Sequence, residues 1–317
     1  MIVVVALNPA LDITHHVDRV DWAGVNRPAV VRAEPGGKGL NVARTLRLLG
    51  ADVLVLGLIG GSTGDAVRSA LNASGVASAF TGIAGDTRRT FAVVDAGRSD
   101  VALFNEPGPP VSAGEYARLL AAYLEAVPAC AAVVLSGSLP PGVPADAYAE
   151  LIRLAAAAGT PAVLDTSDEA LRRGLAAGPA VVKPNLAELE AAVGRAVPWA
   201  GPADLSAVAE AAGEVRDHGA EAVVVSLGAD GLLAVTGEGT WLAAPARAAA
   251  GNPTGAGDAA VAGLAHGLAL GIGWPERLRQ AAALGAAAVA APVAGELRLA
   301  DYERARAGVA INRWERA

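Results

Sequence analysis

The chain has 317 residues, enough for one large α/β domain or for a domain with a small appendage. Its formal net charge of −7 argues against a nucleic-acid-binding protein, which normally presents a basic patch, but allows a local pocket for anionic substrates. Cys130 is the single cysteine, which excludes an intrachain disulfide and a multi-cysteine metal site. The N-terminal residues lack the features of a signal peptide, and the apolar stretch 281–294 is too short to span a membrane. We therefore expect a cytoplasmic protein without a nucleic-acid or membrane partner.

Short β-branched runs alternate with helical patterns along most of the chain. Nearly continuous apolar runs indicate parallel strands covered on both faces, and they occur at Ile2–Leu7, Asp52–Leu58, Ala131–Ser136, Ala162–Asp165, Ala180–Lys183 and Glu221–Leu227. Helical periodicity occurs between them at Leu40–Leu49, Asp65–Ala73, Ala113–Ala126, Ala145–Ala158 and Ala203–Asp217. The pattern predicts an α/β fold with a doubly wound, mostly parallel sheet and helices on both faces. From Ala259 onward it predicts helix to the end of the chain.

Four shorter segments alternate polar and apolar residues, as half-exposed antiparallel strands do. They are Ile13–Val20 with Ala29–Arg32, and Phe91–Asp95 with Val101–Phe104. Because they fall within residues 12–34 and 88–105, they predict a small four-stranded β lid inserted into the main domain. We find no linker that would divide the chain, so residues 1–317 are expected to form a single domain.

The most informative segment is Asn252-Pro-Thr-Gly-Ala-Gly-Asp258, which leads directly into a helical pattern. A glycine-rich turn at a helix N-terminus leaves backbone N–H groups unpaired, and with the helix dipole they form an anion-binding site. Asp258 follows on the first turn, where it can take a proton from a hydroxyl group held beside that site. Phosphoryl transfer to an alcohol needs this combination. The alternative is a plain glycine-rich turn with Asp258 near its cap.

A second glycine-rich turn, Pro35-Gly-Gly-Lys-Gly-Leu-Asn41, also opens a helix and adds a cation, Lys38. Asn41 lies one turn into that helix and can donate to or accept from a sugar hydroxyl. The segment lacks the spacing of a P-loop, so we do not interpret it as a nucleotide site.

Two further segments follow buried strands. In Val182-Lys-Pro-Asn-Leu-Ala-Glu188, Lys183 can pair with nucleotide phosphates, while Asn185 and Glu188 offer oxygen ligands suited to hydrated Mg²⁺. Ser226-Leu-Gly-Ala-Asp-Gly231 ends the next strand, at the edge where open α/β sheets bind ligands. Alone, a solvated helix start and a plain turn would explain these two segments.

Together these motifs resemble the PfkB carbohydrate kinases, which have the ribokinase fold. The resemblance covers essentially the whole chain, with eight motifs in family order: Asn8-Pro-Ala-Leu-Asp12, Gly36-Gly-Lys-Gly39, Gly60-Gly61 with Gly64, Thr87-Arg88, Ser136-Gly-Ser-Leu-Pro140, Lys183-Pro-Asn185, Ser226-Leu-Gly228 and Gly255-Ala-Gly-Asp258. It implies a sugar kinase that uses ATP and Mg²⁺, with lid strands that pair between two subunits of a homodimer.

The resemblance also implies a role for each candidate residue. Asp258 resembles the catalytic base of the family, beside an anion hole formed by Gly255, Ala256 and Gly257. The implied substrate contacts are Asp12, Gly37, Lys38 and Asn41 for the sugar, Arg88 and Ser138 for a phosphate that the sugar already carries, and Arg27 as an additional contact. The implied ATP contacts are Lys183, Asn185, Ser226, Gly228 and Gly231, with Glu188 and Asn185 near Mg²⁺.

Within the family, three motifs resemble the branch that acts on phosphorylated ketohexoses: Asn8-Pro-Ala-Leu-Asp12, Val25-Asn-Arg27 and Ser136-Gly-Ser-Leu-Pro140. This branch includes 1-phosphofructokinases and tagatose-6-phosphate kinases. We expect fructose 1-phosphate as substrate, with a tagatose-6-phosphate kinase or a 6-phosphofructokinase as alternatives. Asn252-Pro-Thr254 is more similar to the tagatose-6-phosphate kinases, and Arg89-Thr90 departs from the usual residues after the Thr-Arg pair.

Three other hypotheses compete with this assignment. A kinase for an unphosphorylated sugar or nucleoside would not need Arg88 with Ser138. A dinucleotide oxidoreductase would need GxGxxG after the first strand, where Asn8-Pro9 stands instead. A non-catalytic relative would not need both Asp258 and its glycine turn, although a fold alone never guarantees activity.

Overall fold

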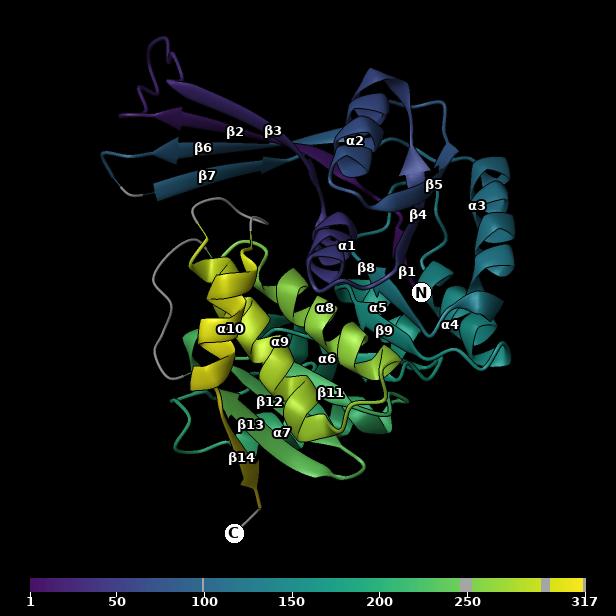
Figure 1. Ribbon diagram of the computed structural model, residues 1–317, viewed down its shortest axis with the longest axis vertical. Helices are drawn as coiled ribbons and strands as arrows, with labels where there is room; N and C mark the ends of the chain where they lie inside the picture. Colours follow the sequence, from purple (N-terminus) through teal and green to yellow (C-terminus); the bar gives the residue numbers. More distant parts are fainter. Residues whose placement is uncertain (99, 246–252, 292–296, 316–317) are drawn as a thin grey trace.

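The computed structural model describes residues 1–98, 100–245, 253–291 and 297–315. Its largest element is a ten-stranded sheet in the order β14-β13-β12-β11-β10-β9-β8-β1-β4-β5 (Figure 1). The strands are β1 (Ile2–Ala6), β4 (Val53–Ile59), β5 (Ala77–Gly82), β8 (Ala132–Ser136), β9 (Ala162–Asp165), β10 (Val181–Val182), β11 (Val223–Ser226), β12 (Leu232–Thr236), β13 (Gly239–Ala244) and β14 (Ala310–Trp314). Neighbours from β5 to β11 are parallel, whereas those from β11 to β14 are antiparallel.

Helices cover both faces of this sheet, because its central strands are apolar on both sides. In β1, Val3 and Val5 pack into one core layer, whereas Ile2 and Val4 pack into the other. The first layer is covered by α3 (Ala113–Ala126), α4 (Ala147–Ala157), α5 (Asp168–Leu175), α6 (Leu186–Val193) and α7 (Ser206–Asp217). The second is covered by α1 (Lys38–Leu48), α2 (Gly61–Ala73), α8 (Ala256–Ala269), α9 (Trp274–Val289) and α10 (Leu299–Gly308). This arrangement confirms the predicted doubly wound α/β fold.

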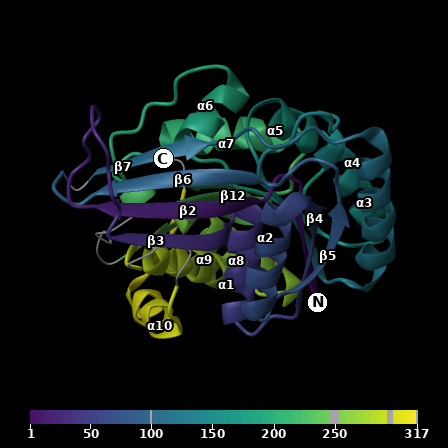
Figure 2. The same ribbon diagram turned by 90° about the horizontal axis from the view of Figure 1, so that it is seen from above.

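A second, four-stranded sheet projects from the main body, as the views from the front and from above both show (Figures 1 and 2). It has the order β3-β2-β6-β7 and consists of β2 (Ala10–Val17), β3 (Val30–Gly36), β6 (Arg88–Asp95) and β7 (Asp100–Asn105). We call it the lid. The two outer pairs are antiparallel as expected, but the central pair of β2 and β6 is parallel.

The C-terminal part of the chain corrects one expectation. Helix was predicted from Ala259 to the end, but β14 follows α10 and pairs with β13 at the edge of the main sheet. Its five residues have only intermediate or exposed side chains, so their strand conformation depends on the neighbouring strand rather than on an apolar pattern. Strands β5, β12 and β13 were also not anticipated. Among the described residues, no helix is long and apolar enough to cross a membrane.

Candidate active site

Two cavities meet at the carboxyl edge of the main sheet. The first, which we call the lid pocket, has about 620 Å³ and lies between the lid and the start of α1. The second, the sheet pocket, has about 800 Å³ and lies between the ends of β10 and β11 and the helices α8 and α9. Three residues line both cavities: Lys38, Thr254 and Asp258. A group passed from one pocket to the other would therefore pass these residues.

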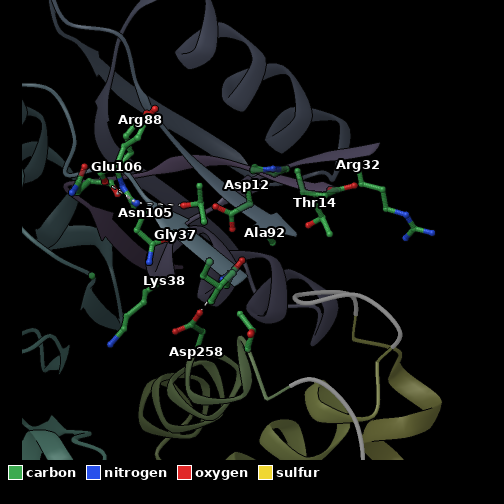
Figure 3. Close-up of a pocket in the computed structure, with 18 of the residues that line it drawn as sticks. Asp12, Thr14, Arg32, Gly37, Lys38, Arg88, Ala92, Asn105, Glu106 and Asp258 are labelled. Atoms are coloured by element: carbon green, nitrogen blue, oxygen red, sulfur yellow. Dashed lines mark hydrogen bonds between the residues drawn. The ribbon is translucent and has the colours of Figure 1, made fainter. Parts of the chain in front are cut away.

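Asp258 lies on the first turn of α8 and is only 7% exposed. Burial, together with the neighbouring Asp165 carboxylate, raises the pKa of Asp258 to about 6, although Asn41 and two lysines act in the opposite direction. The Asn41 amide donates a hydrogen bond of 2.9 Å to Asp258 Oδ2 (Figure 3). Asn41 was expected to contact the sugar; it lines the lid pocket, and its amide also orients the carboxylate. A carboxylate with this pKa is mostly ionised at neutral pH and is a suitable proton acceptor.

The turn before α8 provides backbone donors at the junction of the two pockets. Gly255 has φ +84°, a left-handed conformation that favours glycine. The Ala256 N–H is already bonded to the Pro253 carbonyl at 3.1 Å, so Ala256 does not contribute the N–H that we expected of it. Gly255 and Gly257 are the remaining glycine donors of this turn. A Cβ at Gly257 would lie 3.4 Å from Lys183 Nζ, which places this ammonium beside the turn.

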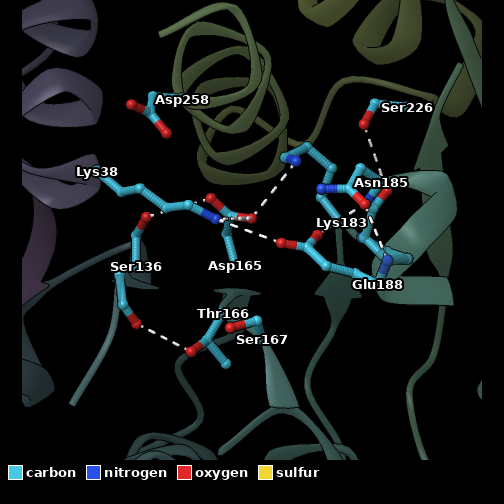
Figure 4. A network of polar contacts seen from close by, with 12 residues as sticks. Lys38, Ser136, Asp165, Thr166, Ser167, Lys183, Asn185, Glu188, Ser226 and Asp258 are labelled. Carbon is cyan, nitrogen blue, oxygen red and sulfur yellow. Dashed lines mark hydrogen bonds and ion pairs between the residues drawn. The ribbon is translucent and has the colours of Figure 1, made fainter. Parts of the chain in front are cut away.

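A network of charges forms the floor of the sheet pocket (Figure 4). Asp165, 1% exposed at the end of β9, lies 3.4 Å from both Lys38 Nζ and Lys183 Nζ. Lys38 Nζ also lies 3.7 Å from Glu188 Oε1. Burial opposes the charge of Lys38, but the carboxylates around it raise its pKa. Lys38 was expected among the sugar contacts; it lines both pockets, and its ammonium is held by carboxylates of the sheet pocket.

Asn185 and Glu188 have a structural role that limits how they bind a metal. They form a capping box at the start of α6, in which Asn185 Oδ1 accepts from the Glu188 N–H at 2.9 Å and Glu188 Oε2 accepts from the Asn185 N–H at 2.8 Å. The described residues contain no group of three His, Cys, Asp or Glu side chains that could hold a metal. Glu188 Oε1, which takes no part in the capping box, and the Asp165 carboxylate are nevertheless hard oxygen donors that fit a water-bridged Mg²⁺.

Arg88 and Ser138 both line the lid pocket, although fifty residues separate them in the sequence. Figure 3 shows Arg88 on the far side of this pocket from Asp258. Asn8 connects Arg88 with Ser138, because its carbonyl accepts from Arg88 Nε at 3.1 Å and its amide donates to Ser138 Oγ at 3.1 Å. Burial lowers the pKa of Arg88, while the Asp12 and Glu106 carboxylates favour its charged form. The geometry therefore presents a partly buried guanidinium and a hydroxyl to one part of the cavity.

Asp12 and Gly37 line the wall between these two ends of the lid pocket. Burial raises the pKa of Asp12, while hydrogen bonding to Thr90 and the charge of Arg88 oppose the increase. A Cβ on Gly36 would lie 2.0 Å from Asp12 Cγ, so the glycine at this position leaves room for the carboxylate. Polar groups along the wall are suited to sugar hydroxyls.

The structure brings together the residues expected to bind the nucleotide and leaves out one substrate contact. Lys183, Asn185, Glu188, Ser226, Gly228 and Gly231 all line the sheet pocket. Gly231 has φ +99°, and a Cβ there would lie 1.9 Å from the Ala243 carbonyl oxygen, so only glycine fits. Arg27 is exposed in the loop between β2 and β3 and does not line the lid pocket, because this loop lies at the outer end of the lid.

Sequence reasoning missed Asp165 and the bridging role of Asn8. Asp165 is the last residue of a correctly predicted strand, so its position at the carboxyl edge was a usable signal. Its two lysine partners are distant in the sequence, and no spacing rule indicates them.

The raised pKa of Asp258 predicts a pH-dependent stability change for Asp258→Asn. The folded protein binds this proton more tightly than the unfolded chain, so protonation of Asp258 stabilises the fold. This stabilisation is complete below about pH 4 and is lost as the pH rises through about 6. Asparagine resembles the protonated acid, so above pH 6 the variant should be more stable by roughly 3 kcal/mol, at 1.36 kcal/mol per pKa unit. Thermal unfolding from pH 4 to 8 measures this. A constant difference between the two proteins would contradict the prediction, and exposed Asp65→Asn is the control.

A mostly parallel sheet with a buried carboxylate and a glycine turn at the junction of two pockets defines an enzyme that transfers a phosphoryl group to a hydroxyl group. A family model described as pfkB family carbohydrate kinase matches residues 5–298. The chain therefore belongs to the pfkB family of carbohydrate kinases.

Solved structures of phosphofructokinases are similar over nearly the whole chain. Phosphofructokinase-2 from Escherichia coli, in its tetrameric inhibited form, is 32% identical, with a TM-score of 0.88 over 96% of this chain and 98% of its own. The same enzyme in complex with fructose-6-phosphate is 32% identical, with a TM-score of 0.86 over 96% and 98%. A protein from Thermotoga maritima, provisionally described as a 1-phosphofructokinase, is 25% identical, with a TM-score of 0.82 over 99% and 100%.

Proposed function

We propose that this protein phosphorylates a phosphorylated ketohexose with ATP. The observation that carries the proposal is the position of Arg88 and Ser138 in the lid pocket, away from the sheet pocket and joined through Asn8. A guanidinium with a hydroxyl beside it is suited to a phosphate group that the acceptor already carries. A free sugar or a nucleoside would offer this partly buried guanidinium no phosphate to bind.

The acceptor hydroxyl lies beside Asp258 in this proposal, and ATP lies in the sheet pocket. Asp258 takes the hydroxyl proton as the oxygen attacks the γ-phosphorus, the bond from that phosphorus to the β–γ bridging oxygen breaks, and ADP leaves. The Gly255 and Gly257 N–H groups, with Lys183 beside them, stabilise negative charge on the transferred group. Lys38 is held at the junction by Asp165 and Glu188 and adds positive charge there.

Mg²⁺ would be held near Glu188 Oε1 and Asp165, largely through water, and would neutralise charge on the ATP phosphates. The three carboxylates of the site, Asp165, Glu188 and Asp258, exceed its two ammonium groups in charge. The site without ligands is therefore suited to the arrival of a cation together with the nucleotide.

Fructose 1-phosphate is our first candidate for the acceptor. A ketohexose with a phosphate at one end and a free hydroxyl at the other fits a pocket with Arg88 and Asp258 at opposite sides (Figure 3). Fructose 6-phosphate satisfies the same description, and the Escherichia coli enzyme solved with this ligand favours it as the second candidate. Tagatose 6-phosphate is the third.

The substrate is tested by measuring ADP release from MgATP with each of these sugar phosphates and with free fructose and ribose. The proposal predicts that kcat/KM is highest for one phosphorylated ketohexose. A preference for an unphosphorylated sugar would refute the role of Arg88 and Ser138. No turnover with any of these acceptors would revive the nucleoside-kinase and non-catalytic hypotheses.

We also propose that two copies of the chain pair through their lids. Apolar side chains remain exposed on the two outer lid strands, among them Val31 on β3 and Phe104 on β7, which do not line the lid pocket. A charge at Phe104 would oppose burial of this surface, so Phe104→Asp should convert a dimer into a monomer in sedimentation velocity. Leu270→Asp, at an exposed leucine after α8, should leave the dimer intact. A wild-type monomer, or a dimer that survives Phe104→Asp, would contradict pairing through the lid.

A further inference from the structure

A third hollow, of about 590 Å³, lies between the C-terminal half of α1 and the residues that precede α10. Arg44 and Arg47 line it from α1, one turn apart and therefore on the same helix face. Arg298, which precedes α10, joins them from the other end of the chain. Three arginines therefore line one hollow, and the described residues that line it include no carboxylate.

Structural roles explain part of this cluster. Arg44 lies 3.8 Å from Glu34, and Arg47 Nε donates to the Gly75 carbonyl at 3.0 Å near the C-terminus of α1. The outer edge of the Arg47 guanidinium is not engaged by these contacts, and among the described residues no carboxylate pairs with exposed Arg298. Three like charges in one hollow repel each other, and a bound anion would remove that repulsion.

We propose that this hollow binds the phosphoryl group of a small phosphorylated metabolite. The planar guanidinium matches a phosphate with two parallel hydrogen bonds, and three such groups can surround one anion. The volume is within the range of small-molecule sites. The chain as a whole carries a net charge of −7 and repels anions, so the attraction is local to this cluster.

Arg44 connects this hollow to the active site, because it lines the lid pocket as well. An anion in the hollow draws the Arg44 guanidinium toward itself and weakens the positive potential that the lid pocket offers to a phosphorylated acceptor. The bound metabolite should therefore raise the KM for the acceptor and leave kcat unchanged. This makes the hollow a regulatory site that shares Arg44 with the lid pocket and no lining residue with the sheet pocket.

Binding of pyrophosphate, counted by equilibrium dialysis at low ionic strength, tests the proposal without any turnover. Wild type should bind one more pyrophosphate per chain than the double variant Arg47→Gln/Arg298→Gln. Pyrophosphate that binds in the active site should be retained by both proteins. The control is Arg172→Gln/Arg173→Gln, which removes the same charge from exposed arginines of α5. Equal stoichiometry in wild type and the first variant would overturn the site. If the control variant also bound one pyrophosphate fewer than wild type, the binding would reflect only the general attraction of anions to surface arginines. That result would overturn the proposed site as well.

Two further measurements keep the test decisive. Arg298→Gln alone changes an exposed side chain, so if the double variant unfolds, this single variant should still weaken the additional binding by about 10-fold. Unchanged affinity would overturn the proposal. In kinetics, pyrophosphate competes in the active site of both proteins, but it binds the hollow more tightly in wild type than in Arg298→Gln. It should therefore raise the acceptor KM more in wild type. Since dialysis needs no acceptor, a wrong assignment of the sugar does not affect the binding result.

Discussion

Asp258→Asn should reduce kcat by about 10²–10⁴, the usual contribution of a positioned general base. The substitution removes the proposed proton acceptor but keeps the size of the side chain and an oxygen that can accept from the Asn41 amide. The KM for either substrate should therefore change little. Initial rates with saturating MgATP and the preferred sugar phosphate measure the effect.

The same variant separates loss of chemistry from loss of structure. Because the introduced amide is neutral and avoids a buried charge, the variant should unfold at a higher temperature than wild type at pH 8 while turning over far more slowly. Asp65→Asn, at an exposed carboxylate on α2, should change neither property. Turnover close to that of wild type would show that another group accepts the proton. A slow variant that is also less stable would leave the slow turnover attributable to misfolding, and would contradict the assigned pKa.

Local sequence predicted the fold where the pattern itself carries the information. Buried parallel strands have continuous apolar runs, and β1 and β9 were placed within a residue of their observed ends. The edge strand β14 has no such run, because its pairing with β13 provides the conformation. The parallel pairing of β2 with β6 depends on how the chain returns to the lid, and alternation of side chains cannot distinguish it from antiparallel pairing.

In the candidate site too, sequence patterns predicted some roles and not others. Backbone roles were accessible from sequence, since the left-handed Gly255 and Gly231 are required by turns that the chain must make. Side-chain roles were less accessible, because they depend on partners from other elements. Asn41 was expected to contact the sugar, and its hydrogen bond to Asp258, more than two hundred residues later, was not anticipated. Lys38 pairs with Asp165, which no motif had indicated.

Arg88→Ala should raise the KM for the phosphorylated acceptor by about 10–100-fold, because it removes hydrogen bonds between a charged donor and a phosphate, each worth about 1.5–3 kcal/mol. The KM for ATP should change much less, since Arg88 lines the lid pocket and not the sheet pocket. Full kinetics with both substrates varied distinguish these constants.

Arg89→Ala provides the matched control for this measurement. Arg89 is the next residue of β6, its side chain points to the opposite face of the strand, and it is exposed and outside the lid pocket. Both variants lose one positive charge from neighbouring positions, so a general electrostatic effect would appear in both. A large increase in acceptor KM for Arg88→Ala alone would place the substrate phosphate at Arg88. Equal changes in the KM for acceptor and ATP, or equal effects of the two variants, would refute that placement, and the acceptor would then have to be sought among unphosphorylated sugars.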